Sequence, residues 1–255
     1  MMSAPCAVSV TTTVDMQVLL QPAWVLHSRA YRDSSSLVDV LTLEYGRVSL
    51  VARGARRPKR RGDSLASVLQ PFTPLLLSYK GRHGLKTLID AEAQQTAMRF
   101  QGERLYSAMY LNELLIRLLQ QDDACGSVFR KYSETLECLA SAAPLAKTLR
   151  AFEWALLAEL GYGVDLSCDG YSGDAISEHG EYCYSQEYGM VAAKKSSTAQ
   201  AVYRGAALLA IAEGVEDPQL EKVEKRLMRE LLAAHLGPKP LYSRELFRTA
   251  RSGRS

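Results

Sequence analysis

The chain has 255 residues, 47% hydrophobic and 23% charged, as in an ordinary globular protein of one large or two modest domains. Its five cysteines form no C-x-x-C pair, which argues against a disulfide framework and fits reduced thiols in a cytoplasm. No apolar run approaches the roughly 20 residues that a membrane span needs, so no membrane partner is expected.

The first residues are rich in Ser, Thr and Val and lack the basic start and apolar core of a secretory signal. We expect residues 1–20 to be a flexible extension, and we hypothesise that translation begins at Met16. The intact mass of the protein expressed from its native locus tests this, because a mass that includes Ser3 to Asp15 would rule it out.

Short strands are predicted from Gln21 to about Asp90. The candidates are rich in β-branched and aliphatic residues and cover 24–26, 37–43, 47–52, 75–79 and 85–89. Gly46 suits a turn between two of them, because glycine readily adopts a positive φ. Five short strands in so few residues are typical of a small closed barrel, so we predict an OB-fold over residues 21–90.

After Asp90 the hydrophobic period becomes helical, as in the leucines of 111–119. We predict an all-helical domain over residues 91–250, interrupted at 162–198 by an irregular insert with a short hairpin. Helices are expected to resume near Ala199. A further helix should begin at Asp217-Pro218 and end at Gly237-Pro238. The fold class is therefore α+β with two domains, a β-barrel followed by helices.

Positive charge is concentrated between Arg47 and Asp90, a segment that contains ten Lys and Arg but only two acids. That segment carries +8, and the total of +3 leaves −5 for the rest of the chain. Like charges repel, so a phosphate counter-anion is expected at the basic loop, residues 53–61. The next hairpin, residues 80–86, carries further cations and is expected to share one face with this loop. The alternative is a solvated loop without a partner. The cations predicted to bind DNA are Arg47, Arg53, Arg56, Arg57, Lys59, Arg60, Arg61, Lys80, Arg82 and Lys86.

Nearby aromatic side chains could stack on bases, although such residues belong more often to a core. The candidates are Phe72, Tyr79 and His83.

Other chemistry finds little support in the residues. The chain has no phosphate-binding G-x-x-x-x-G-K-[ST] motif and no G-x-S-x-G motif, so we do not expect an enzyme. Cys168, His179 and Cys183 lie in the insert without the paired cysteines of a structural zinc site. Neither a metal nor another cofactor is predicted.

Arg150 lies near an apolar stripe of its predicted helix formed by Phe152 and Leu156, with Tyr110 and Leu111 on an earlier helix as possible neighbours. A cation beside an apolar groove can bind an acidic, hydrophobic peptide that ends in a carboxylate. The residues alone favour the simpler interpretation, an ordinary surface arginine.

Taken in order, several segments strongly resemble RecO, a bacterial family of recombination mediators in DNA repair. They are residues 25–29, 46–56, 69–75, 110–115, 152–163 and 236–244. The resemblance runs from about Gln21 to Phe247 and leaves residues 1–15 without a counterpart. It implies an N-terminal OB-fold and a helical domain.

The resemblance also implies a function. Family members bind single- and double-stranded DNA, anneal complementary strands, and act with RecR to help RecA load onto DNA coated by single-strand-binding protein (SSB). They dock the acidic C-terminal tail of SSB on the helical domain, for which Arg150 matches a contact. A four-cysteine zinc site in many members is reduced here to Cys168 and Cys183. The implied location is the cytoplasm, at the nucleoid.

Two rival functions stay open from the residues. In a protein-binding adaptor the basic loop would contact an acidic partner, and a mobility shift with a single-stranded oligonucleotide separates the two cases. A nuclease would need a carboxylate cluster in the insert and would cleave DNA in the presence of a divalent metal.

Overall fold

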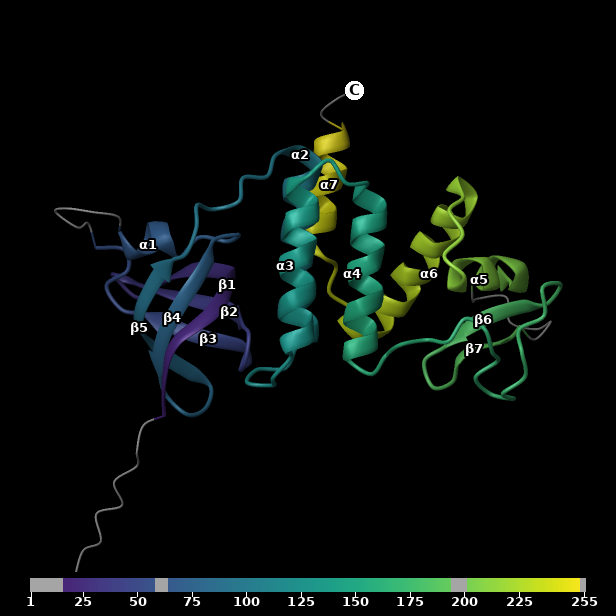
Figure 1. Cartoon of the computed structure of the whole chain (residues 1–255), viewed down its shortest axis with the longest axis horizontal. Helices are drawn as coiled ribbons and strands as arrows, with labels where there is room; N and C mark the ends of the chain where they lie inside the picture. The colour runs from purple at the N-terminus through teal and green to yellow at the C-terminus, as the bar shows by residue number, and fades with distance from the viewer. Residues whose placement is uncertain (1–15, 58–63, 194–200, 253–255) are drawn as a thin grey trace, which may run out of the picture.

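The computed structural model describes residues 16–57, 64–193 and 201–252, with side chains up to Phe247. The expectations for residues 1–15 and for Lys59, Arg60 and Arg61 lie outside these ranges. The molecule is elongated, with a β-barrel at one end, a bundle of helices in the middle and a small sheet at the other end (Figure 1). No helix in the described ranges is long and apolar enough to cross a membrane.

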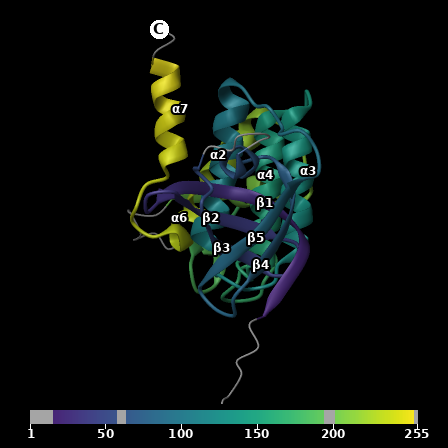
Figure 2. The same cartoon turned by 90° about the vertical axis from the view of Figure 1, so that its left-hand side faces the viewer.

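The N-terminal domain is a closed five-stranded barrel, which confirms the predicted OB-like architecture. Its strand order is β1-β2-β3-β5-β4, and the parallel pairing of β3 with β5 closes it (Figure 2). A four-residue helix, α1, precedes β4. The elements are β1 (Gln17–Tyr31), β2 (Ser35–Thr42), β3 (Gly46–Ala52), α1 (Leu65–Val68), β4 (Pro74–Lys80) and β5 (Leu85–Ala93).

Alternation of side chains along the strands fills the barrel. On β2 and β3, Val38, Val40, Val48 and Leu50 are fully buried and face one another in the interior. Gly46, at the start of β3, has φ +60°, and a Cβ there would lie 1.7 Å from the backbone oxygen of Asp123. Glycine is therefore required both for the turn and for the close approach of the next domain.

The barrel is joined to the helices by a packed interface with buried hydrogen bonds. Trp24 and Leu26, on β1, belong to the same buried cluster as the helical core. The indole N–H of Trp24 donates to Ser133 Oγ at 2.8 Å, and Asn112 Nδ2 donates to the Leu26 carbonyl at 2.9 Å. Tyr132 in turn donates to Asn112 Oδ1, so both domains share one polar network.

The C-terminal domain is mainly helical, as predicted. Its helices are α2 (Gly102–Leu118), α3 (Gly126–Ala140), α4 (Leu145–Glu159), α5 (Gly205–Ala212), α6 (Pro218–Leu236) and α7 (Tyr242–Ser252). The start of α6 is confirmed, because Asp217 accepts from the backbone N–H groups of Gln219 and Leu220 at 2.7 and 3.1 Å. Gly237, with φ +67°, ends it.

The insert is more regular than expected. The predicted hairpin is present as β6 (Glu181–Ser185) and β7 (Gly189–Ala192). A third strand, β8 (Val202–Arg204), pairs with the other side of β6. The expectation that helices resume near Ala199 is therefore wrong, because Val202 and Tyr203 complete this sheet and α5 begins only at Gly205.

Candidate nucleic-acid interface and apolar pocket

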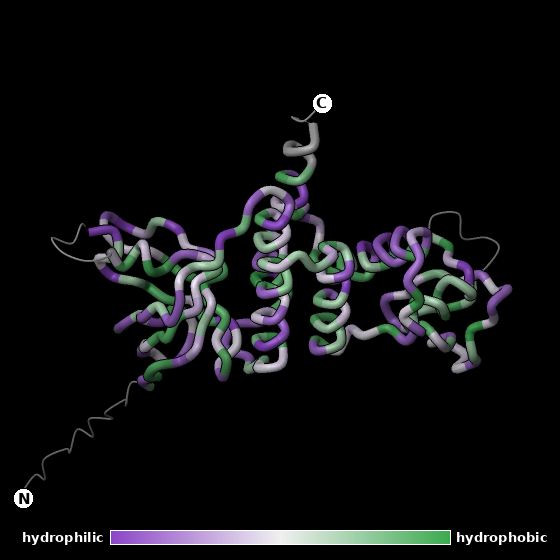
Figure 3. Tube along the Cα trace, turned by 45° about the horizontal axis from the view of Figure 1, so that its top comes forward, coloured by the Kyte–Doolittle hydropathy of each residue, from purple (hydrophilic) through white to green (hydrophobic). Residues whose placement is uncertain are grey.

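The loop after β3 is attached to the turn between β1 and β2 by Arg56. Its Nη2 donates to the carbonyl of Asp33 at 2.8 Å, and its Nε donates to the carbonyl of Ser35 at 3.2 Å. Arg56 therefore braces the loop, although its side chain stays exposed. Arg53 and Arg57 are also exposed. The loop and the turn lie at the end of the barrel far from the helices, and hydrophilic residues predominate there (Figure 3).

Sequence reasoning missed two exposed arginines that join this group. They are Arg29 on β1 and Arg32 in the following turn. The strand register brings them there, because Ala30 pairs with Ser36 and Ser36 pairs with Ala52 on β3. Arg29 therefore ends up two strands away from the start of the basic loop. Antiparallel pairing of the first three predicted strands could have given this neighbourhood. We call Arg29, Arg32, Arg53 and Arg57 the arginine end of the barrel.

Lys80 and Arg82 are exposed but lie elsewhere. Lys80 pairs with Gln17 at the start of β1, and the N–H of Gly81 donates to the Met16 carbonyl at 3.0 Å. The arginine end, by contrast, lies where β1 finishes. Among the described residues, the loop and the hairpin therefore do not form the expected continuous face, because they lie at opposite ends of β1.

Lys86 and Arg47 do not belong to an exposed face, which corrects their assignment. The Lys86 side chain is 2% exposed and forms an ion pair with Asp122 at the junction with the helical domain. Arg47 Nε donates to the Leu119 carbonyl at 3.0 Å, and its guanidinium lies 3.9 Å from Asp39. Both cations join the barrel to the helical domain, because their partners Leu119 and Asp122 lie at the end of α2 and in the segment that follows it.

Of the aromatic side chains considered for base stacking, two belong to the core. Tyr79 is fully buried, and Phe72 packs edge-on against Phe100 with ring centroids 5.2 Å apart. Only His83 of the three is exposed.

A pocket of about 720 Å³ lies in the helical domain between α2, α4, α6, the start of α7 and the segment that leads into it. Its apolar lining comes from Leu145, Leu149, Leu241 and Phe247, among others. Cationic residues also line it, namely Arg150, Lys225, Arg229 and Arg244. The acids Glu103 and Glu245 belong to the lining as well, so the pocket is mixed in charge with an excess of cations.

Beside the pocket lies a buried carboxylate, Glu153, which is fully inaccessible to solvent. Its Oε1 accepts from the Tyr110 hydroxyl at 2.5 Å and from Arg150 Nη2 at 2.9 Å. Burial raises the pKa of Glu153, and Arg150, Tyr110 and Arg244 act against the increase. Burial and the neighbouring Glu153 raise the pKa of Tyr110, which keeps its hydroxyl protonated as a donor. Glu153 thus fixes the orientation of Arg150 beside the pocket.

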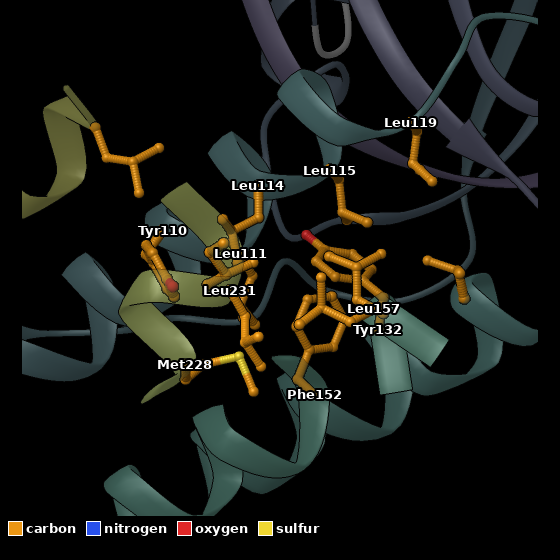
Figure 4. Close-up of a cluster of buried hydrophobic side chains, with 14 of the residues drawn as sticks. Tyr110, Leu111, Leu114, Leu115, Leu119, Tyr132, Phe152, Leu157, Met228 and Leu231 are labelled. Carbon is orange, nitrogen blue, oxygen red and sulfur yellow. The ribbon is translucent and has the colours of Figure 1, made fainter. Parts of the chain in front are cut away.

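Three residues predicted for the groove are instead part of the core. Leu111, Phe152 and Leu156 are 0%, 0% and 1% exposed and do not line the pocket. Figure 4 shows Leu111 and Phe152 packed among other buried side chains, including Tyr132. Of the five predicted residues, the pocket contains Tyr110 and Arg150. The apolar stripe of α4 was therefore correctly found but faces inward.

Sequence reasoning missed Arg244 and Phe247, which reach the pocket from the C-terminal segment. The Arg244 guanidinium carbon lies 6.0 Å from the centroid of the Tyr110 ring. The available signal was the position of Arg244 within the last of the segments that resemble the family. Nothing in the local pattern, however, indicates that this segment returns to α2.

Asp169 organises part of the insert by accepting hydrogen bonds from three backbone N–H groups. Asp169 Oδ1 accepts from the N–H groups of Tyr171 and Ser172 at 2.8 and 3.1 Å, and its Oδ2 accepts from Ala192 at 2.7 Å. Across residues 16–57, 64–193 and 201–252, no group of three or more His, Cys, Asp or Glu could hold a metal ion. A structural zinc site needs four ligands, and no such group surrounds Cys168 or Cys183 in the described part of the insert, so its residues do not fit a zinc site.

Comparison with known proteins agrees with this architecture. The family model described as "Recombination protein O N terminal" matches residues 16–97, and "Recombination protein O C terminal" matches residues 99–245. DNA repair protein RecO of Nitrosococcus oceani is 46% identical over 237 residues, which cover 92% of this chain and 95% of that protein. RecO of Methylococcus capsulatus is 43% identical over 235 residues, covering 92% and 95%. RecO of Psychromonas ingrahamii is 42% identical over 233 residues, covering 91% and 99%. The chain therefore belongs to the RecO family of DNA repair proteins.

Proposed function

We propose that this protein binds DNA and anneals complementary strands as a non-enzymatic mediator of recombinational repair in the RecF pathway. The observation that carries the proposal is the arginine end of the barrel, where four exposed arginines meet from β1, the next turn and the basic loop. Such a group binds phosphate oxygens without reading base edges. Annealing requires that two strands be held with their charge neutralised and their bases free.

The test replaces Arg29, Arg53 and Arg57 together with Ala. Each lost phosphate contact should reduce the slope of log affinity against log salt by about 0.7 for single strands, so the triple variant should lose up to about 2 units. Fluorescence anisotropy with a labelled single-stranded oligonucleotide at several salt concentrations measures this slope. Arg56 is left unchanged because it also braces the loop.

A matched control removes the same charge from the helical domain by replacing exposed Arg99, Arg130 and Lys222 with Ala. The control should change the slope much less. Equal slopes for wild type and the barrel variant, with the same affinity at low salt, would refute DNA binding by the arginine end.

We further propose that the apolar pocket receives the acidic C-terminal tail of SSB. Supporting observations are an apolar lining and the presence of Arg150 and Arg244 at the pocket. A peptide with acidic residues, an apolar terminal side chain and a free carboxylate would satisfy both features. The tail would bring the protein to SSB-coated single strands, where RecR and RecA are the proposed further partners in the cytoplasm at the nucleoid.

The pocket is tested by titrating the protein with such a peptide in two forms, one with a free C-terminal carboxylate and one with a C-terminal amide. The carboxylate form should bind roughly tenfold more tightly, because it offers a charge-assisted bond to arginine. Indistinguishable affinities would remove the pocket assignment but leave DNA binding by the barrel untouched.

A further inference from the structure

One face of α2 carries the C-terminal segment of the chain. Tyr106, Tyr110, Glu113 and Arg117 recur at helical spacing and lie along a single stripe. Each of them contacts a residue of the chain that follows α6. Tyr106 packs edge-on against Phe247, with ring centroids 5.4 Å apart.

Glu113 binds the start of α7 through both carboxylate oxygens. Its Oε1 accepts from the N–H of Tyr242 at 2.9 Å. Its Oε2 accepts from the N–H of Ser243 at 2.9 Å and from the Ser243 hydroxyl at 2.7 Å. The first N–H groups of a helix lack partners within the helix, and a negative charge is favourable there. Glu113 therefore fixes both the position and the beginning of α7.

Arg117, one turn further along α2, binds the segment that precedes α7. Its Nη2 donates to the carbonyl of Lys239 at 2.7 Å, and its Nη1 donates to the carbonyl of Pro240 at 3.2 Å. The same Nη2 also donates to the carbonyl of Leu236 at the end of α6. A planar guanidinium can bridge several carbonyls in this way, whereas an ammonium group cannot match the geometry.

These contacts determine where one wall of the pocket lies. Leu241, Arg244 and Phe247 come from the segment that Glu113 and Arg117 hold, while neither Glu113 nor Arg117 lines the pocket. Arg150 belongs to α4 and is positioned separately by Glu153. The presence of two arginines at one pocket therefore depends on the attachment of the C-terminal segment to α2.

We propose that Glu113 and Arg117 are positioning residues that hold Arg244 at the pocket and so set its affinity for an acidic, carboxylate-terminated peptide. The inference rests on the proposed function of the pocket. It adds that the site is composite, because its second arginine is held through residues that do not touch the ligand.

The experiment is a double-mutant cycle on the full chain with Glu113→Gln, Arg244→Ala and the combined variant. The probe is a labelled synthetic peptide of several aspartates followed by a phenylalanine with a free C-terminal carboxylate. Glu113→Gln should weaken binding roughly tenfold, because an amide cannot accept all three bonds that the carboxylate accepts. In the Arg244→Ala background the same change should cost about twofold or less, because the residue through which Glu113 acts is gone.

Controls separate positioning from loss of folding. Glu134→Gln, an exposed acid on α3, should leave peptide affinity unchanged. Arg117→Lys retains the charge but should still weaken binding, and thermal unfolding of every variant should show one transition near that of wild type. Equal losses from Glu113→Gln with and without Arg244 would overturn the positioning role. Failure of wild type to bind the peptide at all would overturn the pocket's function and, with it, this inference.

Discussion

Arginines at the two candidate sites of this protein differ in their surroundings. At the arginine end of the barrel, Arg29 is exposed on β1, Arg32 in the following turn, and Arg53 and Arg57 in the basic loop. At the pocket, the Arg150 side chain is 16% exposed and is paired with Glu153, whose side chain is 0% exposed. Exposed charges interact weakly with one another in water and salt, whereas a buried charge must keep its partner.

This difference determines which substitutions alter binding without altering the stability of the fold. Removing an exposed arginine subtracts a phosphate contact and leaves little else disturbed. Removing Arg150 leaves a carboxylate buried and unpaired, so stability and binding change together. The first region can be probed by simple truncation, and the second needs substitutions that respect the pair.

The largest effect is expected for Arg150→Ala, which should lower the free energy of unfolding by about 3 kcal/mol because it leaves Glu153 without its cation. Arg57→Ala should change it by less than about 0.5 kcal/mol. Urea unfolding measures both. The pair Arg150→Met with Glu153→Leu should regain part of the loss, because it removes the buried charge but leaves the Tyr110 hydroxyl without its acceptor. Similar costs for Arg150→Ala and Arg57→Ala would abolish the distinction between the two sites.

A smaller effect is expected for Lys86→Met, which tests the reassignment of that lysine from the DNA face to the domain junction. The change should cost roughly 1–2 kcal/mol, less than a fully buried pair, because the Asp122 side chain is 29% exposed. DNA affinity at fixed salt, measured by anisotropy, should stay within about twofold of wild type. A loss of affinity comparable with that of the barrel triple variant would return Lys86 to the interface.

The smallest effect concerns the insert, a region apart from both sites. Burial of the Asp169 carboxyl would raise its pKa, but the N–H groups of Ser172, Ala192 and Tyr171 outweigh burial and lower it. A lowered native pKa contributes stability above the unfolded value near about 3.9, and this stability is lost as pH falls through the native value.

Asp169→Asn should therefore cost about 1 kcal/mol at pH 7 and make unfolding less sensitive to pH between about 5 and 3. Urea unfolding at several pH values checks this against Asp174→Asn, an exposed acid of the same loop. Identical pH dependence in wild type and Asp169→Asn would show that the three N–H bonds do not stabilise the charged form. Peptide and DNA affinities should not change.

Much of the architecture was predictable because its signals are local. Alternating aliphatic residues, the glycine at Gly46 and the Asp217-Pro218 start each act over a few residues, and the barrel, its turn and α6 follow as expected. The third strand of the insert was not predictable in this way. Val202 and Tyr203 have no alternating partner nearby, and their strand exists because β6 offers a free edge.

The candidate sites show the same limit more sharply. Net charge in the segment 47–90 correctly indicated a basic barrel, but it could not separate exposed Arg53 from buried Lys86, because burial depends on the helical domain packed at the junction. Likewise, the periodicity of α4 identified Phe152 as apolar without showing which way it faces. The packing of neighbouring elements decides whether an apolar stripe lines a groove or belongs to the core.

By itself, the sequence determined the barrel, the helices, their ends and the presence of a basic region. These depend on backbone preferences and on the spacing of apolar side chains, which neighbours along the chain decide. The tertiary structure alone decided that Arg29 joins the basic loop, that Arg47 and Lys86 leave it, and that Arg244 meets Arg150 at one pocket. Contacts between residues up to 130 positions apart, such as Glu113 with Ser243, bring these groups together, and no local pattern encodes them.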